Sequence, residues 1–194
     1  MISFYYNIAL IILKYKNIIG EKQKKGIRMK YFIGAPVPEN YKNKIEMLRA
    51  EFRFLTTEPH ITVVPPPALP DDDSFIRGVA DVCRNTKAFK IRLNGLEQFG
   101  SRVLYVGVHS PGLIDLYENI FKALNLPKEK RGYTPHLTVV KQRPNKPVDI
   151  DRIKKRAETK LVSSPEYTLR SITVYHQPKE RFIYLPYMEI PLGD

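Results

Sequence analysis

One five-residue pattern occurs twice in this chain, and it restricts the possible folds more than any other feature. Residues 59–63 read Pro-His-Ile-Thr-Val, and residues 135–139 read Pro-His-Leu-Thr-Val. Successive side chains of a β-strand point to opposite faces, so in each copy the His and the Thr share one face while the aliphatic residues share the other. Each copy therefore predicts a short strand that buries its aliphatic side and presents an imidazole beside a hydroxyl on the opposite side.

The elements around the two copies repeat as well. Hydrophobic periodicity and turn residues predict, in order, a strand at 30–34, a helix from about Pro38, the His60 strand, a helix ending near Asn85, strands at 89–93 and 103–108, a helix after Ser110-Pro111, the His136 strand, a helix at 149–162, and strands at 167–174 and 182–185. The order of helix, His strand, helix and hairpin thus occurs twice. We therefore expect an α+β protein of two lobes with antiparallel sheets, in which a pseudo-twofold axis brings both His strands to one central cleft.

The composition excludes several classes of protein. A chain of 194 residues with 43% apolar content can bury one substantial core or two small lobes that share an interface. Its net charge of +12 favours polyanionic partners, although a solvated basic surface would give the same value. The single cysteine, Cys83, excludes a disulfide scaffold and a Cys/His zinc module, and it fits a reducing cytoplasm. Cys83 lies in an apolar stripe at helical spacing, so we expect a buried residue rather than a nucleophile.

Residues 1–28 differ from the rest of the chain. An apolar run from Ile2 to Leu13 is followed by a lysine-rich segment. The run is too short for a bilayer-spanning helix, and the charges lie on the wrong side for a signal peptide. We interpret 1–28 as an appended or mis-assigned extension, with Met29 as the effective start of the domain, and 29–194 as a single bilobal domain, expected to be monomeric. A peripheral membrane helix with a basic flank is the alternative for the extension.

The paired motifs indicate acid–base chemistry on a phosphate. Two imidazoles with ordinary pKa values near 6.5 can hold one neutral and one protonated partner near neutral pH, so His60 and His136 together can remove one proton and deliver another. Thr62 and Thr138 each offer a hydroxyl donor that a strand would place rigidly for a phosphoryl oxygen. These groups would hydrolyse a phosphodiester without a metal ion. The alternative for His60 and His136 is a pair of structural histidines.

Three residues near the second motif are further candidates for substrate binding. Arg131 and Lys141 could meet a phosphate, and exposed basic side chains are the alternative. Tyr133 could stack on a base or close the wall of the cleft. His109 and His176 lack the motif, and we expect both at the surface.

At these motifs the chain resembles the 2H phosphoesterase superfamily, which includes the RNA 2′,3′-cyclic phosphodiesterases also called 2′-5′ RNA ligases. The resemblance covers about 29–190 and extends to the segment Arg131-Gly132-Tyr133-Thr134-Pro135 before the second motif. It implies the bilobal LigT-like fold, with two antiparallel sheets lining a central cleft and helices outside. It also implies that His60 and His136 are the acid and base, that Thr62 and Thr138 bind phosphate, and that neither a metal nor a cofactor takes part.

The chain departs from the RNA cyclic phosphodiesterase branch at two places. That branch commonly has an arginine three places after the second Thr, where this chain has Lys141, a point charge without a bidentate fork. The branch continues after the first motif with an aromatic-Leu-Gly run, where this chain has Val64 and three prolines. The exact substrate and branch are therefore open.

The hypothesis that follows is a cytoplasmic phosphodiesterase that opens 2′,3′-cyclic phosphates at RNA or nucleotide ends, with reversible 2′-5′ ligation as a further activity. A non-catalytic module that binds RNA ends is one alternative, and it predicts salt-sensitive binding without turnover. A phosphodiesterase for a small cyclic phosphate derived from ADP-ribose is another. The sequence does not assign which His is the acid and which is the base.

Overall fold

The computed structural model describes residues 29–54, 56–127, 132–142, 148–161, 165–178 and 183–194. The elements are β1 (Lys30–Pro36), α2 (Glu39–Glu51), β2 (His60–Val64), the 3₁₀ turn η1 (Pro66–Ala68), α3 (Ile76–Arg84), β3 (Phe89–Phe99), β4 (Val103–His109), α4 (Pro111–Ala123), β5 (His136–Lys141), α5 (Ile150–Lys160), β6 (Glu166–Leu169), β7 (Ser171–Gln177) and β8 (Leu185–Pro191). The extension 1–28 and Arg131 lie outside these residues. No helix in the described ranges is both long and apolar enough to cross a membrane.

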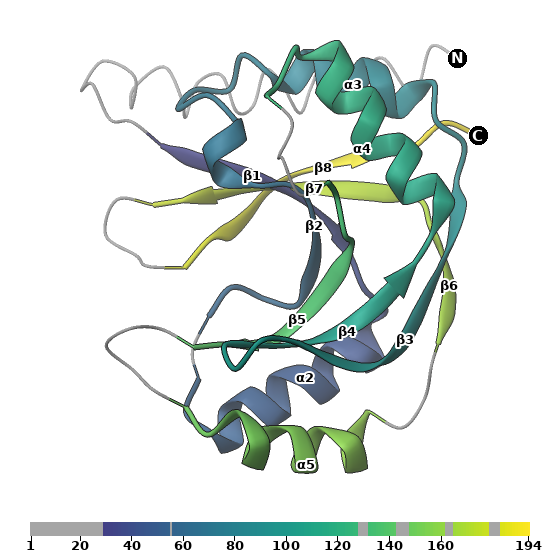
Figure 1. Ribbon diagram of the computed structural model, residues 1–194. Coiled ribbons are helices and arrows are strands. Elements are labelled where there is room, and N and C mark those ends of the chain that lie inside the picture. Colours follow the sequence, from purple (N-terminus) through teal and green to yellow (C-terminus); the bar gives the residue numbers. More distant parts are fainter. Residues whose placement is uncertain (1–28, 55, 128–131, 143–147, 162–164, 179–182) are drawn as a thin grey trace.

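The described strands form one curled antiparallel sheet in the order β6-β3-β4-β5-β2-β1-β7-β8 (Figure 1). The two His strands, β2 and β5, are neighbours at its centre, where Ile61 pairs with Leu137. The α+β fold is as expected, but the prediction of two separate sheets was wrong. Backbone hydrogen bonding between β2 and β5 joins the two halves of the sheet. Without it, β2 and β5 would each be an edge strand with unpaired backbone groups. We call β1, β2, β7 and β8 the first lobe, and β3 to β6 the second lobe.

Each lobe is covered by a pair of helices, and one helix of each pair connects strands of the opposite lobe. Helix α2 connects β1 to β2 in the first lobe, yet it packs against α5 and β5 of the second. Helix α4 connects β4 to β5 in the second lobe, yet it packs against α3 and β2 of the first as well as against β3 of its own lobe. Figure 1 shows the two pairs on opposite outer sides of the curled sheet. Each half of the chain therefore contributes to both lobes.

The C-terminal strands differ from the sequence prediction. The strand expected at 167–174 is interrupted at Arg170 and gives β6, which pairs with β3, and β7, which pairs with β1. β6 is the edge strand of the second lobe and β7 lies between β1 and β8 in the first, so the chain changes lobes at this point. On its other side β7 pairs with β8 at 185–191, a strand that begins later than the one expected at 182–185.

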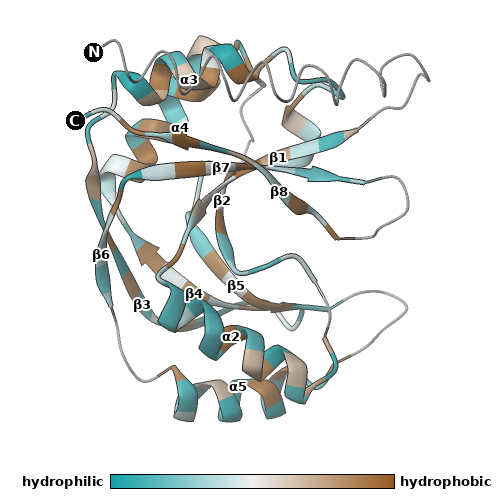
Figure 2. Cartoon of the chain, turned by 180° about the vertical axis from the view of Figure 1, so that it is seen from behind, coloured by the Kyte–Doolittle hydropathy of each residue, from teal (hydrophilic) through white to brown (hydrophobic). Residues whose placement is uncertain are grey.

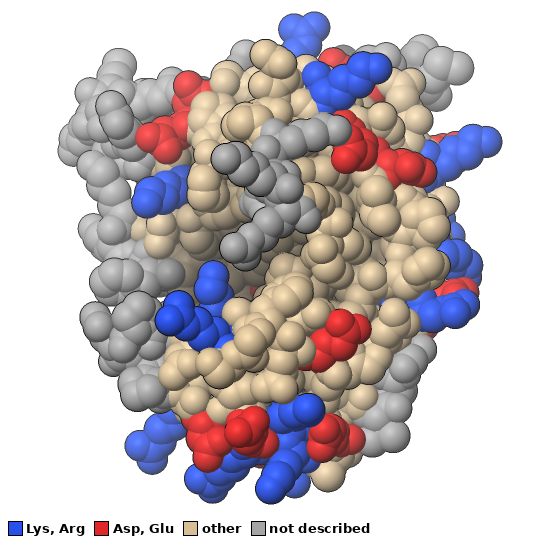
Figure 3. Space-filling view, viewed as in Figure 1, with Lys and Arg blue, Asp and Glu red and all other residues tan. Residues whose placement is uncertain are grey.

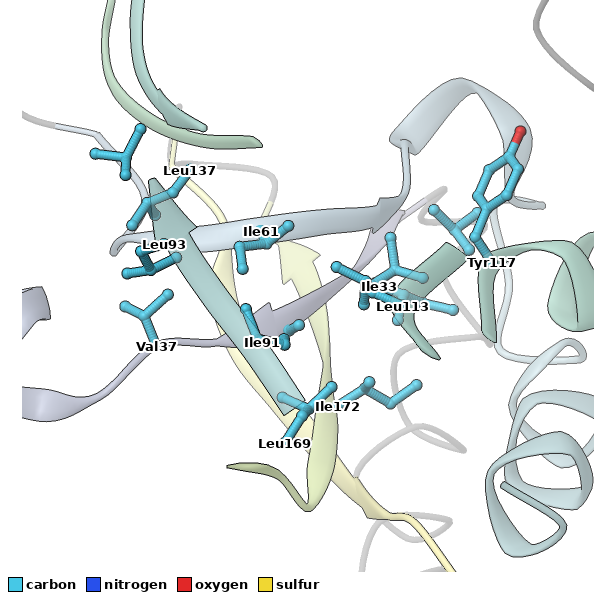
Figure 4. Packing of buried hydrophobic residues seen from close by; sticks show 14 of the residues in the cluster. Ile33, Val37, Ile61, Ile91, Leu93, Leu113, Tyr117, Leu137, Leu169 and Ile172 are labelled. Carbon is cyan, nitrogen blue, oxygen red and sulfur yellow. The ribbon is translucent and has the colours of Figure 1, made fainter. Parts of the chain in front are cut away.

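The hydrophobic core follows the predicted alternation of the His strands. Ile61, Val63, Leu137 and Val139 are all fully buried. Figure 4 shows Ile61 and Leu137 packed among apolar side chains of neighbouring elements. Hydrophobic and hydrophilic residues alternate along the covering helices in Figure 2, as expected for helices with one buried face. The apolar reverse face of each His strand thus fixes which face its imidazole and hydroxyl occupy.

Cys83 is fully buried in α3, as predicted. Burial raises the pKa of its thiol to about 12, so the thiolate is not formed near neutral pH.

Candidate active site

The two His-x-Thr pairs lie side by side on the concave face of the sheet. Because β2 and β5 are antiparallel and Ile61 pairs with Leu137, His60 lies across from Thr138 and Thr62 lies across from His136. All four side chains line one cleft of about 900 Å³ between the lobes, which the space-filling view shows as a hollow (Figure 3). Tyr133 and Lys141 line the same cleft. The structure therefore brings together the sequence-predicted residues that it describes.

Both imidazoles are held in the same way by their own backbone. Nδ1 of His60 lies 2.7 Å from the carbonyl oxygen of Glu58, and Nδ1 of His136 lies 2.9 Å from the carbonyl oxygen of Thr134. A carbonyl oxygen only accepts, so Nδ1 carries the proton in each ring. Nε2 is then the nitrogen that can accept or deliver a proton in the cleft, and the neutral ring is a ready proton acceptor.

Aromatic side chains from the two next strands pack against each imidazole. The His60 ring lies 4.6 Å from Phe32 of β1 and 5.3 Å from Tyr175 of β7, measured between ring centroids. The His136 ring lies 5.4 Å from Tyr105 of β4 and 5.1 Å from Phe99 of β3. In each lobe the two aromatic rings also stack on each other, at 4.4 Å and 4.1 Å. The pseudo-twofold symmetry thus extends from the motifs to the walls that orient them.

A tyrosine–glutamate pair completes each wall. The Tyr175 hydroxyl donates to the Glu58 carboxylate at 2.9 Å, and the Tyr105 hydroxyl donates to the Glu97 carboxylate at 2.9 Å. Glu58 also pairs with Lys42 at 2.7 Å, which fixes the residue whose carbonyl holds His60. These pairs link the orientation of each ring to groups outside the cleft.

His60 is partly buried, and this changes its charge. Burial lowers the pKa of His60 to about 4, and the positive charge of Arg49 acts in the same direction. The hydrogen bond to Glu58 opposes the shift but does not cancel it. His60 is therefore neutral at pH 7 in the unliganded protein.

Arg49 is a cleft residue that the sequence reasoning missed. It is only 8% exposed, and its guanidinium donates to the carbonyl oxygens of Val139 at 2.9 Å, Thr57 at 2.9 Å and Thr138 at 2.7 Å. It ties α2 to the second motif and to the segment before the first. Burial lowers its pKa to about 10, which still leaves it charged at neutral pH. Its position in the helical pattern of α2, beside the buried Leu48, carried no signal that distinguished it from a surface arginine.

Tyr133 holds the first motif from the opposite lobe. Its hydroxyl donates to the carbonyl oxygen of Thr62 at 2.9 Å, and its ring stacks on Tyr117 at 4.2 Å. Gly132 precedes it with φ of +71°, a conformation that favours glycine and turns the chain into this position. Of the two predicted roles for Tyr133, closure of the cleft wall fits these contacts. Burial raises its pKa, so the hydroxyl stays a donor.

The remaining histidines lie outside the cleft. His109 is exposed at the end of β4, as expected. His176 is not a free surface residue, because it is partly buried and its ring lies 5.2 Å from Tyr187. Within the described residues, no group of three or more His, Cys, Asp or Glu could hold a metal ion.

The fold is shared with several solved structures. A structure described as a phosphoesterase matches with a TM-score of 0.60 and 18% identity, over 87% of this chain and 100% of that one. LigT of E. coli complexed with 3′-AMP matches with a TM-score of 0.57 and 19% identity, over 86% and 99%. TT0787 of Thermus thermophilus matches with a TM-score of 0.56 and 17% identity, over 85% and 99%. These likenesses define a LigT-like α+β fold.

The sequence then gives the family. Residues 37–181 match the model of the 2′-5′ RNA ligase superfamily, and the chain belongs to this family of LigT-like 2H phosphoesterases. It is also 26% identical over 159 residues to an RNA 2′,3′-cyclic phosphodiesterase of Methanocaldococcus jannaschii, which covers 76% of this chain and 90% of that protein.

Proposed function

We propose that this protein hydrolyses 2′,3′-cyclic phosphates at RNA or nucleotide ends, by acid–base catalysis between His60 and His136. The observation that carries the proposal is the placement of two imidazoles, each with Nδ1 bound to a backbone carbonyl, on neighbouring strands that line one cleft. A cyclic phosphodiester needs one proton removed from water and one delivered to the departing ribose oxygen. Two such groups meet both needs without a metal ion.

The charge of His60 suggests the direction of proton transfer. Neutral His60 takes a proton from water through Nε2 as the water oxygen attacks phosphorus, and protonated His136 gives its Nε2 proton to the ribose oxygen as the P–O bond breaks. The product is a phosphate monoester beside a free ribose hydroxyl, and the two histidines have exchanged protonation states. Thr62 and Thr138 donate to the non-bridging oxygens, where negative charge accumulates in the transition state.

The same groups can run a ligation. If a ribose 5′-hydroxyl occupies the position of water, its attack on the cyclic phosphate gives a phosphodiester in place of a monoester. When the bond to the 3′-oxygen breaks, the product is a 2′-5′ linkage. The extra activity thus needs no additional catalytic group.

The test is turnover of 2′,3′-cyclic AMP by the purified protein in the presence of EDTA. We expect His60→Ala and His136→Ala each to lower kcat by about 10²- to 10⁴-fold, and the double variant to lose little more than either single variant, because the two act as one unit. His109→Ala, which changes an exposed histidine outside the cleft, is the matched control. Turnover that survives loss of both motif histidines would overturn the proposal.

The same experiment separates the other candidate functions. Salt-sensitive RNA binding by a protein that never turns over a cyclic phosphate would indicate a binding module. Turnover of a cyclic phosphate derived from ADP-ribose, but not of RNA ends, would indicate the small-molecule enzyme. Separating 2′- from 3′-phosphate products identifies which ribose oxygen leaves.

A further inference from the structure

A second hollow lies outside the cleft, on the outer side of the α2 and α5 helix pair (Figure 1). It has a volume of about 450 Å³. Two residues at the C-terminal end of α2 and four residues of α5 line it: Glu51, Phe52, Arg152, Lys155, Arg156 and Thr159. The four on α5 follow the i, i+3, i+4, i+7 spacing of one helix face. We call this hollow the α2–α5 groove, and none of its residues takes part in the proposed reaction.

Only part of the positive charge in the α2–α5 groove is neutralised. The Glu51 carboxylate accepts from Nε of Arg156 at 2.9 Å and also pairs with Lys160. The Arg152 guanidinium lies 5.8 Å from the centre of the Phe52 ring, which holds it at the groove. Among the described residues, neither Arg152 nor Lys155 has a carboxylate within ion-pair distance, and both are exposed. The groove therefore presents two uncompensated cations to solvent.

The helices that cover the other lobe show no such excess of positive charge. Helix α5 carries five basic and two acidic residues. Helices α3 and α4 together carry three basic and three acidic residues. Figure 3 shows Lys and Arg side chains, interspersed with carboxylates, at the bottom of the molecule over α2 and α5. A basic surface that is limited to one helix pair indicates a polyanionic partner for that pair.

The α2–α5 groove adjoins the cleft at the C-terminal end of α2. Phe52 lines the groove, whereas Arg49 and Phe54 line the cleft. The backbone N–H groups of Phe52 and Phe54 both donate to the carbonyl oxygen of Arg49, at 3.2 Å and 2.8 Å, so the chain turns tightly here. Two residues of chain span at most about 7 Å. A strand that leaves the cleft past Phe54 therefore comes directly to the groove.

We propose that the α2–α5 groove binds the sugar–phosphate backbone of the RNA whose 3′ end occupies the cleft, with Arg152 and Lys155 each contacting an upstream phosphate. An RNA backbone carries one negative charge per nucleotide, and a row of cations on successive helix turns, about 6 Å apart along the axis, matches such a series of charges. Contacts of this kind position the strand without reading its sequence. The inference rests on the proposed function, since the RNA end in the cleft supplies the strand, and it extends the substrate beyond a single nucleotide.

Two probes that the enzyme does not consume test the groove by equilibrium binding. They are 3′-AMP, which fills only the cleft, and a single-stranded RNA of about 10 nucleotides with a 3′-phosphate, a length typical of single-strand sites. We expect the wild-type protein to bind the RNA more tightly than 3′-AMP, and we call this ratio of affinities the length gain. The double variant Arg152→Gln/Lys155→Gln should lose most of the length gain and keep its affinity for 3′-AMP and its kcat for 2′,3′-cyclic AMP.

Salt dependence gives the number of phosphate contacts. For two contacts on a single strand, the double variant should reduce the slope of log affinity against log salt by about 1.4. The advantage of the wild type over this variant should then shrink about 7-fold between about 50 and 200 mM salt. Arg77→Gln/Lys122→Gln, which removes two exposed cations from α3 and α4, makes the same change in net charge and is the matched control. Equal losses in the two double variants would show an effect of net charge alone and overturn the groove.

Glu51→Gln tests the groove with the opposite sign. It removes the carboxylate that holds Arg156 and Lys160, so we expect tighter RNA binding and a steeper salt slope, with unchanged affinity for 3′-AMP. A purely structural role for Glu51 would lower Tm without any gain in RNA affinity. Asp81→Asn is the control, because it breaks an exposed ion pair with Arg84 on α3 and changes the net charge equally. RNA binding that is unchanged or weaker in Glu51→Gln would contradict the proposal.

The outcomes separate the groove from the proposed function. If the wild type shows no length gain, or the Arg152/Lys155 variant keeps it, the groove fails while turnover of cyclic phosphates still supports the enzyme. If that variant loses the length gain but the wild type never turns over a cyclic phosphate, the proposed function fails and the groove stands as an RNA surface. If polyglutamate of equal charge binds as tightly as the RNA and loses affinity in the same variant, the surface takes an acidic protein and the proposal is overturned.

Discussion

At the scale of single residues, Arg49 links the electrostatics of the site to its geometry. It is a buried guanidinium that supplies backbone hydrogen bonds to both motif regions and a positive charge close to His60. The two contributions can be separated by substitution. A methionine at this position removes both the charge and the hydrogen bonds, whereas a lysine keeps the charge and loses the planar guanidinium that donates several hydrogen bonds at once.

We predict that Arg49→Met shifts the acid limb of the kcat/KM profile to higher pH. Burial and the Arg49 charge hold the pKa of His60 near 4, so removing the charge raises that pKa. The reaction needs neutral His60, and a raised pKa means that activity is lost at a higher pH as the solution is acidified. Arg49→Lys should keep the wild-type limb. Both variants should lose about 2–4 kcal/mol of stability, because buried carbonyl oxygens lose their donors. An unchanged limb in Arg49→Met would contradict this account.

The sequence predicted the motif residues of the site but not the residues that orient them. Alternation along each strand was sufficient to place His60, Thr62, His136 and Thr138 on one face. The residues that orient them come from other strands and from α2, and nothing local marks Arg49, Phe99, Tyr105 or Tyr175. Such long-range partners depend on strand order and register, which a single sequence does not specify.

At the scale of elements, β1 must pass close behind the His60 ring, and Gly34 makes this possible. Gly34 pairs with Thr62 across β1 and β2. A Cβ built at Gly34 would lie 3.1 Å from the Tyr175 ring, 3.2 Å from the Phe32 ring and 3.3 Å from Cβ of His60. The tight packing of these rings therefore depends on the missing side chain.

We predict that Gly34→Ala lowers kcat by displacing the His60 ring, and costs about 1–3 kcal/mol of stability through overpacking. Gly95→Ala is the matched control, because a Cβ at Gly95 meets nothing within 4 Å and that strand position is exposed. Denaturant unfolding and turnover measured on both variants check the prediction. Equal effects of the two substitutions would argue against a packing role for Gly34.

Most elements were predictable from local patterns, and the failures have a physical cause. The strand predicted at 167–174 has continuous β propensity, so nothing local indicates that Arg170 interrupts it. The interruption is a tertiary effect. Tyr167 and Leu169 pair with β3 in one lobe, whereas the buried Ile172 and Val174 belong to β7, which pairs with β1 and β8 in the other lobe. Propensity describes the preference for a strand and not the partner that the strand finds.

At the scale of the whole molecule, the repeated sequence predicted two lobes but not their connection. The halves share one sheet through β2 and β5, and the helices α2 and α4 each cover the lobe opposite to the strands they connect. Neither lobe can keep its core if the other unfolds, because each would lose one covering helix. Two lobes built in this way should behave as one cooperative unit.

We therefore predict a single thermal transition, with equal calorimetric and van't Hoff enthalpies, for the intact chain. Ile61→Ala truncates a fully buried side chain at the join of the lobes and should cost about 2–5 kcal/mol, which lowers Tm by about 4–20 °C while the transition stays single. Ile114→Ala makes the same change at a 42% exposed position and should leave Tm nearly unchanged. Hydrogen exchange should accelerate together in β1 and β4 of the Ile61 variant, because weakening the join exposes both lobes through one opening reaction. Exchange that accelerates in one lobe alone would show that the lobes unfold separately despite their shared sheet.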